Sequence, residues 1–463
     1  MTHLSLRIRV FLMFCGYAFA AICVVAVGLW MGWRQVGDGD AISGFVTSGM
    51  VAAFGILGLS AGVWLLFDDH VSKPIETIAA SLRVKTHSGG NATFDSGTAQ
   101  YLGDLGPAVV AAQNALDKAL NGGAMTAHSK VALLRAQRDQ LVTILSDIPI
   151  ATLLISADHQ IVLYDGQAAN LMERVGAAKL KTSVFDYLVA DQITGALAQL
   201  KASPDDRSEI AVQGHCGETY HGYIRMFGEG RGYTLMLEPH ALAPARPMTY
   251  DFDLLRSEKS THLDSTPLSD LVFVVFDTET TGLDPQKDDV VQLGALRIVN
   301  AKIVGGEILE TLVNPGRLIP SRSTDVHGIT DAMVSDAPDF AQVCDAFHRF
   351  SQGAVLVAHN APFDMAFLDR GAKGGDITFD NPVLDTVLLS AVTFGGIAIH
   401  TLDAICDRLD ITIPADLRHT AMGDAVATGR AFLAMLKILE GRGLTTFGAL
   451  HAETAKHRRI LKG

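Results

Sequence analysis

The distribution of apolar residues divides the chain into an uncharged N-terminal part and a longer part of mixed polarity. Two stretches, Val10–Trp33 and Ala41–Phe67, contain no charged residue. Each is longer than the roughly 20 residues that a helix needs to cross a bilayer. The pattern therefore predicts two transmembrane helices, joined by a tight loop, in a membrane anchor that spans residues 1–67.

Basic residues lie mostly outside the two predicted spans. The loop of residues 34–40 contains only Arg34, whereas five basic residues flank the spans: Arg7, Arg9, Lys73, Arg83 and Lys85. Loops rich in Lys and Arg stay in the cytoplasm. We therefore expect a multi-pass protein of the inner (cytoplasmic) membrane whose termini and soluble domains are cytoplasmic.

Residues 68–140 contain apolar positions at helical spacing. Ile75, Ile78 and Leu82 recur in this way, and a second helical stretch follows at Pro107–Leu120. Two short amphipathic helices with a connector, directly after a membrane helix, resemble a HAMP signalling linker. A plain juxtamembrane helical stalk is the alternative that this pattern leaves open.

Residues 141–238 show the period-2 pattern of strands, interrupted by one short helix. Ala151–Ile155 and Ile161–Tyr164 are predicted strands on either side of a turn, and a helix is expected at Gln167–Glu173. Two alternating segments around Gly228-Glu229-Gly230 predict a hairpin. This order of elements resembles a PAS sensor domain, an α+β fold. The flavin-adduct cysteine motif of the light-sensing members is absent, which favours a structural or dimerising domain with no assigned ligand.

The following residues, 239–270, are rich in Pro, Ser and charge, which predicts a linker. Beyond it, Leu271–Phe276 is a continuous apolar run that is typical of a buried strand. Side chains alternate along a strand, so Asp277 and Glu279 point to the same side. Adjacent carboxylates repel each other, and a divalent cation such as Mg²⁺ or Mn²⁺ would offset that repulsion.

Two later segments supply further polar side chains. The segment VLVAHNAPFDMAFLDR predicts a strand, a turn and a helix that carries Asp364 beside Phe363. Near the C-terminus, His419 lies five residues before Asp424, which begins an amphipathic helix. That spacing allows both side chains to reach one site while His419 stays in a loop.

These motifs resemble the active site of the DEDD superfamily of 3′–5′ exonucleases. The spacing of His419 and Asp424 matches the histidine-type branch, which includes the proofreading epsilon subunit of DNA polymerase III. The resemblance covers residues 271–440 and extends to three segments that recur in that branch: VHGIT, LVNPG and VLDT. It implies an α/β, ribonuclease H-like domain with a mixed sheet flanked by helices, followed by a C-terminal tail at 441–463.

The resemblance also implies roles for individual residues. Four carboxylates would bind two divalent metal ions, Mg²⁺ or Mn²⁺: Asp277, Glu279, Asp364 and Asp424. His419 would be the general base, because an imidazole accepts protons near neutral pH. Five residues would contact or position the terminal nucleotide: Thr280, Leu283, His327, Asn360 and Phe363. A decayed site that keeps the fold is the alternative for this set.

Charge and composition qualify the expected partners. Residues 271–437 hold 12 Lys and Arg against 22 Asp and Glu, and the whole chain has a net charge of −13. Non-specific nucleic-acid binders usually carry a basic stripe. We therefore expect a short-lived grip on a single-stranded DNA or RNA 3′ end. GxxxG spacings at Gly28/Gly32 and Gly58/Gly62 allow a homodimer through the membrane helices, with the PAS-like domain as a second contact.

The sequence thus predicts a membrane-anchored exonuclease that releases nucleoside 5′-monophosphates. The order of domains suggests that the PAS-like domain regulates it. A membrane sensor whose nuclease-like domain is only a binding or output module is the rival hypothesis. The membrane tether favours repair, turnover or work on signalling nucleotides over a dedicated role beside a replicative polymerase.

Overall fold

The computed structural model describes residues 6–36, 42–79 and 149–462, with short gaps at 203–204, 229–230, 243–245, 257–261, 373–376 and 415–416. The chain divides into two compact units, of which one contains the N-terminal helices and the other contains Thr126–Gly463. The predicted helices at Pro107–Leu120 and most of the HAMP-like segment at 68–140 lie outside the described residues.

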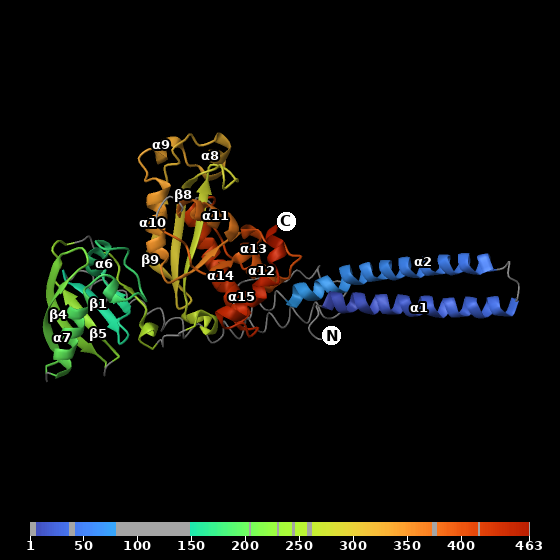
Figure 1. Ribbon diagram of the computed structural model, residues 1–463, viewed down its shortest axis with the longest axis horizontal. Coiled ribbons are helices and arrows are strands. Elements are labelled where there is room, and N and C mark those ends of the chain that lie inside the picture. Colours follow the sequence, from blue (N-terminus) through green and yellow to red (C-terminus); the bar gives the residue numbers. More distant parts are fainter. Residues whose placement is uncertain are drawn as a thin grey trace, which may run out of the picture. The chain divides into compact units, whose positions relative to one another are not determined.

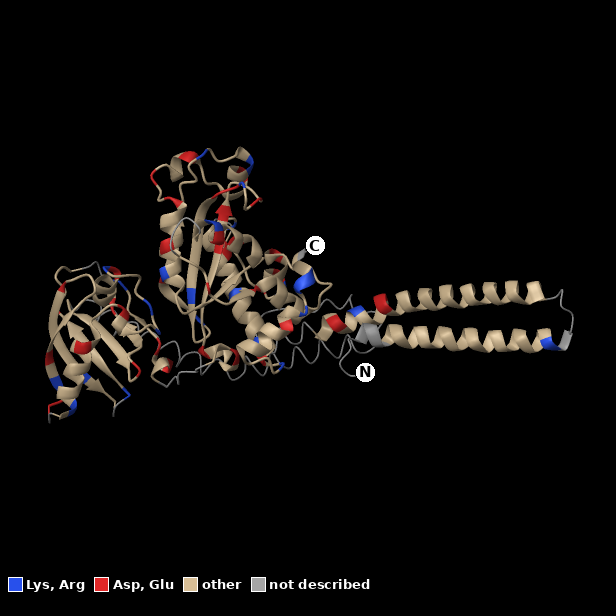
Figure 2. Cartoon of the chain, viewed as in Figure 1, with Lys and Arg blue, Asp and Glu red and all other residues tan. Residues whose placement is uncertain are grey.

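The N-terminal unit is an antiparallel pair of long helices, α1 (Leu6–Val36) and α2 (Ile42–Phe67) (Figure 1). A π-helical turn, Asp68–Ser72, continues α2. Two segments, Val10–Arg34 and Ile42–Ala79, are long and apolar enough to cross a membrane. Figure 2 shows their lengths free of charged side chains except near the helix ends. The predicted helices are therefore present, and their insertion in a membrane stays a prediction.

Aromatic contacts join the two helices. Phe11 and Trp64 pack edge to face with ring centroids 5.0 Å apart. A Cβ atom built at Gly32 would lie 3.3 Å from the ring of Phe45, so one glycine of the GxxxG pairs serves the contact within the hairpin. The other three, Gly28, Gly58 and Gly62, have no heavy atom within 4 Å of such a Cβ.

The first part of the second unit is a six-stranded antiparallel sheet in the order β3-β4-β5-β1-β2-β6. Its strands are β1 (Ala151–Ser156), β2 (Ile161–Tyr164), β3 (Arg207–Gln213), β4 (Thr219–Phe227), β5 (Gly232–Leu237) and β6 (Thr249–Tyr250). Helices α6 (Gly166–Glu173) and α7 (Ala190–Ala202) lie between β2 and β3 in the chain. The predicted strands, short helix and hairpin are all confirmed as local elements.

Part of the predicted linker is ordered. β6 adds to the sheet by pairing with β2, and Leu254 is buried in the core of the same region. Pro, Ser and charge dominate the composition here, but the apolar residues between them are enough to attach the segment to the sheet.

The second part is a five-stranded mixed sheet in the order β11-β10-β7-β8-β9. Its strands are β7 (Val272–Thr280), β8 (Val290–Val299), β9 (Lys302–Leu312), β10 (Val355–Ala358) and β11 (Val383–Asp385). β7 pairs in parallel with β10 and antiparallel with β8, as expected for a mixed sheet. This α/β domain agrees with the fold that the sequence predicts.

Helices cover both faces of this sheet. Val274 and Phe276 of β7 pack into a core with α10 (Phe340–Ser351) and α11 (Ala361–Ala372). On the other face, Phe273 packs edge to face with Phe432 of α14 (Ala421–Glu440), with ring centroids 4.8 Å apart. Four further helices are described in the domain: α8 (Ser321–His327), α9 (Asp331–Val334), α12 (Thr386–Phe394) and α13 (Leu402–Arg408).

The predicted C-terminal tail, residues 441–463, contains a packed helix. α15 (Phe447–Ala455) buries Phe447 and Leu450. Thr446, directly before the helix, forms an isolated β-bridge with Pro267. Phe447 and Leu450 are at helical spacing, but two such residues in a short segment give a weak signal in the sequence. Contacts with residues that are far away in the chain, such as Pro267, stabilise the helix.

A close backbone contact joins α14 to the sheet. A Cβ atom at Gly294 would lie 2.4 Å from the Met422 nitrogen and 2.5 Å from the Ala421 carbonyl carbon. Both neighbours are backbone atoms, which cannot rotate away as a side chain can. Only glycine therefore fits at this position of β8.

We expect Gly294→Ala to lower the free energy of unfolding by about 1–3 kcal/mol, because it overpacks a fixed contact. Thermal unfolding of the full chain in detergent would measure the change. Gly305→Ala is the matched control, since a Cβ there meets no heavy atom within 4 Å. Equal effects of both substitutions would contradict the prediction.

Candidate active site

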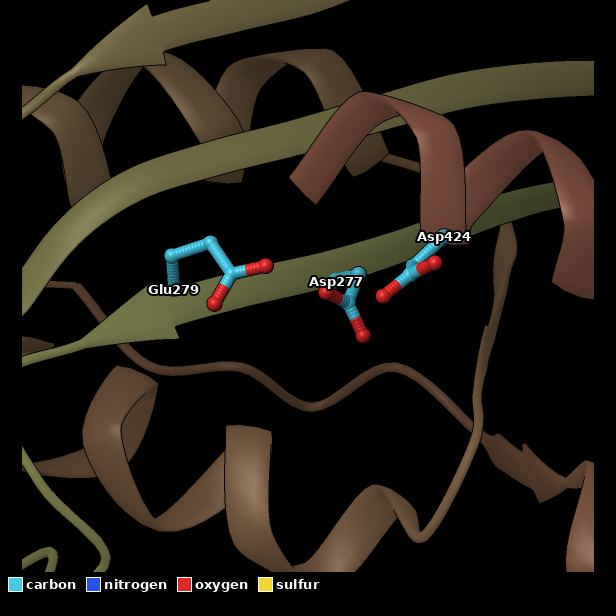
Figure 3. Close-up of side chains that lie close together, drawn as sticks. All are labelled: Asp277, Glu279 and Asp424. Atoms are coloured by element: carbon cyan, nitrogen blue, oxygen red, sulfur yellow. The ribbon is translucent and has the colours of Figure 1, made fainter. Parts of the chain in front are cut away.

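Three acidic side chains from two elements meet at the end of β7. Asp277 and Glu279 lie on the same face as Phe273 and Val275, toward α14, and Asp424 comes from the first turn of α14. One carboxylate oxygen from each of the three lies within 4.8 Å of the others (Figure 3). The structure thus brings together two residues predicted from strand alternation and one that is about 145 positions away in the chain.

The first turn of α14 is fixed by polar contacts that orient Asp424. The side-chain oxygen of Gln292 on β8 accepts a hydrogen bond from the Ala421 N–H at 3.1 Å. Thr420 caps the helix by accepting from the Gly423 N–H at 3.0 Å. Gly423 itself approaches the Leu417 carbonyl so closely that an added Cβ would lie 1.8 Å from its oxygen. Gln292 is therefore a positioning residue for the site.

Asp364 reaches the site from the other layer. It is 2% exposed, and its Oδ1 accepts hydrogen bonds from the Thr278 hydroxyl at 2.6 Å and the Thr278 N–H at 3.2 Å. It is not among the three clustered carboxylates, although its charge acts on Asp277 and Glu279. Three of the four predicted ligands therefore form one group, and the fourth lies beside it.

Burial disfavours negative charge on all four carboxyl groups, and repulsion from the others adds to this at Asp277 and Glu279. Burial, followed by the charges of neighbouring carboxylates, raises the pKa of Asp277 well above its usual range. The same causes raise the pKa of Glu279 to about 8. Burial raises the pKa of Asp364 to about 7 and also raises that of Asp424. A divalent cation would offset both effects, so this set of oxygen donors fits a hard metal ion.

His419 lies in the turn that precedes α14. Its side chain is exposed, and its backbone is left-handed with φ of 57°. Its charge lowers the pKa of Asp424, which opposes the larger effect of burial. The structure therefore places this imidazole beside the carboxylate cluster in a loop, as the five-residue spacing predicts. Its role as a general base stays a prediction.

The five residues predicted to contact substrate are placed in different ways. Thr280 donates its hydroxyl to the Gly282 carbonyl at 2.7 Å, and Leu283 is 84% exposed. His327 is buried at the end of α8, where its Nδ1 accepts from the Ile329 N–H at 3.0 Å. Asn360 is exposed with φ of 61°, and Phe363 is half-buried against Phe367.

Other charged contacts at this edge were not singled out from the sequence. Arg317 Nη2 donates to the Thr281 hydroxyl at 2.6 Å and to Asp288 at 3.0 Å, which holds the turn after β7. Asp385 accepts from the Ala361 N–H at 2.9 Å and so anchors the start of α11. The segment LVNPG directly precedes Arg317 and the segment VLDT contains Asp385, and these two segments were the available signal.

Comparison with known proteins supports an exonuclease domain. The family model RNase_T, described as an exonuclease, matches residues 274–432. A DNA polymerase III subunit epsilon-like protein of Rhodobacter capsulatus is 32% identical, with 100% of this chain and 99% of the relative covered. A DNA polymerase III PolC-type protein of Caldanaerobacter subterraneus subsp. tengcongensis is 39% identical over 39% of this chain but only 13% of its own length.

Among solved structures, Exonuclease X in complex with 5′ overhanging duplex DNA is 25% identical, with a TM-score of 0.32. The match covers 39% of this chain and 99% of that one. E. coli Exonuclease I in complex with a dT13 oligonucleotide is 20% identical, with a TM-score of 0.33 and coverage of 38% and 42%.

The raised pKa of Glu279 predicts how the metal-free chain responds to pH. The folded chain holds a proton on this group up to about pH 8, whereas an ordinary carboxyl loses it near 4.5. The contribution of Glu279 to the free energy of unfolding in EDTA should therefore be greatest below about pH 4.5. It should fall as the pH rises toward 8. Each unit of pKa difference corresponds to about 1.4 kcal/mol, so we expect a loss of at least about 2 kcal/mol.

Thermal unfolding between pH 5 and 8 would measure this loss. Glu279→Gln should flatten the profile, while Glu310→Gln, at an exposed position of β9, should not. Adding Mn²⁺ at about a hundred times its dissociation constant should return about 2.7 kcal/mol at pH 8. A profile of the wild type that rises across this window would contradict the prediction.

Proposed function

Since this chain belongs to the family of DNA polymerase III subunit epsilon-like proteins, we propose that it is a membrane-anchored, metal-dependent 3′–5′ exonuclease. The carboxylates of Asp277, Glu279 and Asp424, gathered within 4.8 Å with His419 beside them, are the observation that carries this proposal. The proposed reaction is hydrolysis of the terminal phosphodiester of a single-stranded nucleic acid, with release of a nucleoside 5′-monophosphate.

The carboxylate cluster would hold the metal. Asp277, Glu279 and Asp424 supply oxygen donors, and Asp364 is the proposed fourth ligand from the opposite layer. Two divalent ions, Mg²⁺ or Mn²⁺, would supply charge stabilisation for the attacking and leaving oxygens. The hydrogen bonds of Asp364 to Thr278 fix its carboxylate in the metal-free state and tie it to the backbone between the two other ligands.

His419 is the proposed general base. A neutral imidazole accepts the proton of the attacking water near physiological pH. Its exposed position before α14 gives it access to water, while the cap at Thr420 fixes the residue next to it. A turn allows the ring to move during substrate entry, which a position inside the helix would prevent.

The substrate proposal rests on the residues around the cluster. Leu283 and Phe363 offer apolar surface for a base, while Thr280 ends β7, His327 ends α8 and Asn360 lies in the turn before α11. The acidic surface, with 22 Asp and Glu against 12 Lys and Arg over residues 271–437, favours brief contact with a single strand over tight duplex binding. DNA and RNA ends both satisfy this chemistry, and a polymerase partner is not required by it.

The N-terminal helices are the proposed anchor. Their apolar segments exceed the length of a membrane span, and the excess of basic flanking residues favours a cytoplasmic location of both termini and the soluble domains. Helix packing through the unoccupied glycines Gly28, Gly58 and Gly62 would support a homodimer. The region Ala151–Leu237 would add a PAS-like contact and regulate the nuclease, with the HAMP-like segment at 68–140 between them.

We expect the full chain in detergent to shorten 5′-labelled single-stranded DNA or RNA from the 3′ end in Mg²⁺ or Mn²⁺ and not in EDTA. Asp277→Ala should abolish the ladder, because it removes a metal ligand. His419→Ala should slow it about 10²–10⁴-fold, the usual contribution of a general base. Gel analysis of labelled products would give both rates.

Two matched controls test specificity. His221→Ala and Asp336→Ala change the same residue types at exposed positions away from the cluster, and both should keep the wild-type rate. A substrate with a blocked 3′ end should resist digestion. A folded chain that binds the strand but produces no ladder on any substrate would favour the sensor with a binding module.

Topology gives an independent prediction. A C-terminal epitope should be digested by protease in inside-out membrane vesicles and protected in right-side-out ones, because the basic flanks stay in the cytoplasm. Protein that is washed from the membranes by carbonate would contradict the anchor, and digestion only in right-side-out vesicles would contradict the orientation.

A further inference from the structure

A short segment of the PAS-like region is bound by the nuclease sheet through its backbone. Leu180, in the connection between α6 and α7, donates its N–H to Glu307 Oε1 at 2.6 Å. Its carbonyl accepts from Arg297 Nη2 at 3.1 Å. Arg297 lies on β8 and Glu307 on β9, so both backbone polar groups of one residue are satisfied by two neighbouring strands of the nuclease domain.

The residues on either side of Leu180 extend this contact. Lys179 donates its ammonium to the carbonyl of Arg349 at the end of α10, at 2.8 Å. Lys181 donates to the carbonyl of Asp270, just before β7, at 2.6 Å. We call Ala177–Lys181 the docking segment. Its contacts reach α10 and the ends of β7, β8 and β9.

The contact is buried and contains charge. The side chains of Arg297 and Glu307 are 2% and 0% exposed, with Nε and Oε2 3.4 Å apart. Tyr164 of β2 also donates to Glu307 Oε1, at 3.0 Å. Burial lowers the pKa of Lys179 to about 8. Removing one member of such a pair leaves its partner's charge buried, so the contact tolerates little separation.

Apolar packing accompanies these polar contacts. Val299 and Val304, on either side of the β8–β9 turn, are buried in the same core as β1, β2 and β5. At the rim, the exposed Lys302 pairs with Asp253 at 3.0 Å and with the buried Asp251 at 3.6 Å. The end of the β8–β9 hairpin is therefore part of the core of the PAS-like region.

The same strands lead directly to the carboxylate cluster. Arg297 is opposite Val274 on β7, three residues before Asp277, and about 10 Å separates such positions along a strand. β8 also carries Gln292 and Gly294, which hold the first turn of α14. A shift of β8 relative to β7 would change the relative positions of Asp277 and Asp424.

We propose that the docking segment Ala177–Lys181 is an intramolecular interaction surface on which the geometry of the carboxylate cluster depends. The PAS-like region thereby acts on the nuclease through β8, and the nuclease domain is not autonomous. The consequence for the cluster rests on the metal binding proposed above, whereas the docking itself does not.

Arg297→Met in the full chain tests both the docking contact and its effect on the carboxylate cluster. Hydrogen exchange followed by mass spectrometry should show at least tenfold faster exchange in the docking segment and in β8–β9. Calorimetry should show at least tenfold weaker Mn²⁺ binding. Arg225→Met is the matched control, because it makes the same substitution in an exposed ion pair with Asp206 and should change neither quantity.

Lys179→Met combined with Lys181→Ala provides a second route that leaves no charge buried without its partner. It should give the same two changes, and it replaces Arg297→Met if that variant proves too unstable to purify. Faster exchange at the docking segment with unchanged Mn²⁺ affinity would overturn the coupling to the cluster. Unchanged exchange in both variants would overturn the docking surface.

These readouts separate this inference from the proposed activity. A wild-type chain that binds Mn²⁺ but cleaves nothing would contradict the exonuclease and leave the docking test intact. An active wild type whose Mn²⁺ affinity equals that of the docking-segment variants would support the exonuclease and contradict the coupling.

Discussion

The backbone contact between α14 and β8 is the constraint on which the site depends. Because Gly294 has no side chain, the first turn of α14 lies directly on the strand, and Gln292 and Thr420 satisfy two of its free N–H groups. Asp424 then projects beside two carboxylates of β7. A wider separation would move this carboxylate away from the others, whatever their own positions.

This placement concentrates negative charge in a buried region, which opposes folding in the absence of a cation. The hydrogen bonds that Thr278 donates to Asp364 offset part of that cost within the protein itself. The charges of His419 and Arg418 favour the ionised form of Asp424, but the effect of burial on that carboxyl is larger. The arrangement that lowers the stability of the metal-free chain is therefore the same one that would bind a metal ion.

Local patterns in the sequence were enough for much of this architecture. Strand alternation gave the shared face of Asp277 and Glu279, and the spacing of His419 and Asp424 gave a loop followed by a helix. Contacts between distant residues were less accessible. The hydrogen bonds of Asp364 to Thr278, the packed helix α15 and the binding of Leu180 by Arg297 and Glu307 depend on tertiary structure, for which single positions carry little signal.

The shared burial of Val299 and Val304 has a consequence for how such a chain can be rearranged in evolution. A recombination point in the stretch between β5 and β7 looks like a natural boundary, yet it would separate these valines from the residues that cover them. Each half would then expose apolar surface and aggregate more readily. Gene fusions that keep both halves together should survive more often than exchanges of either half alone.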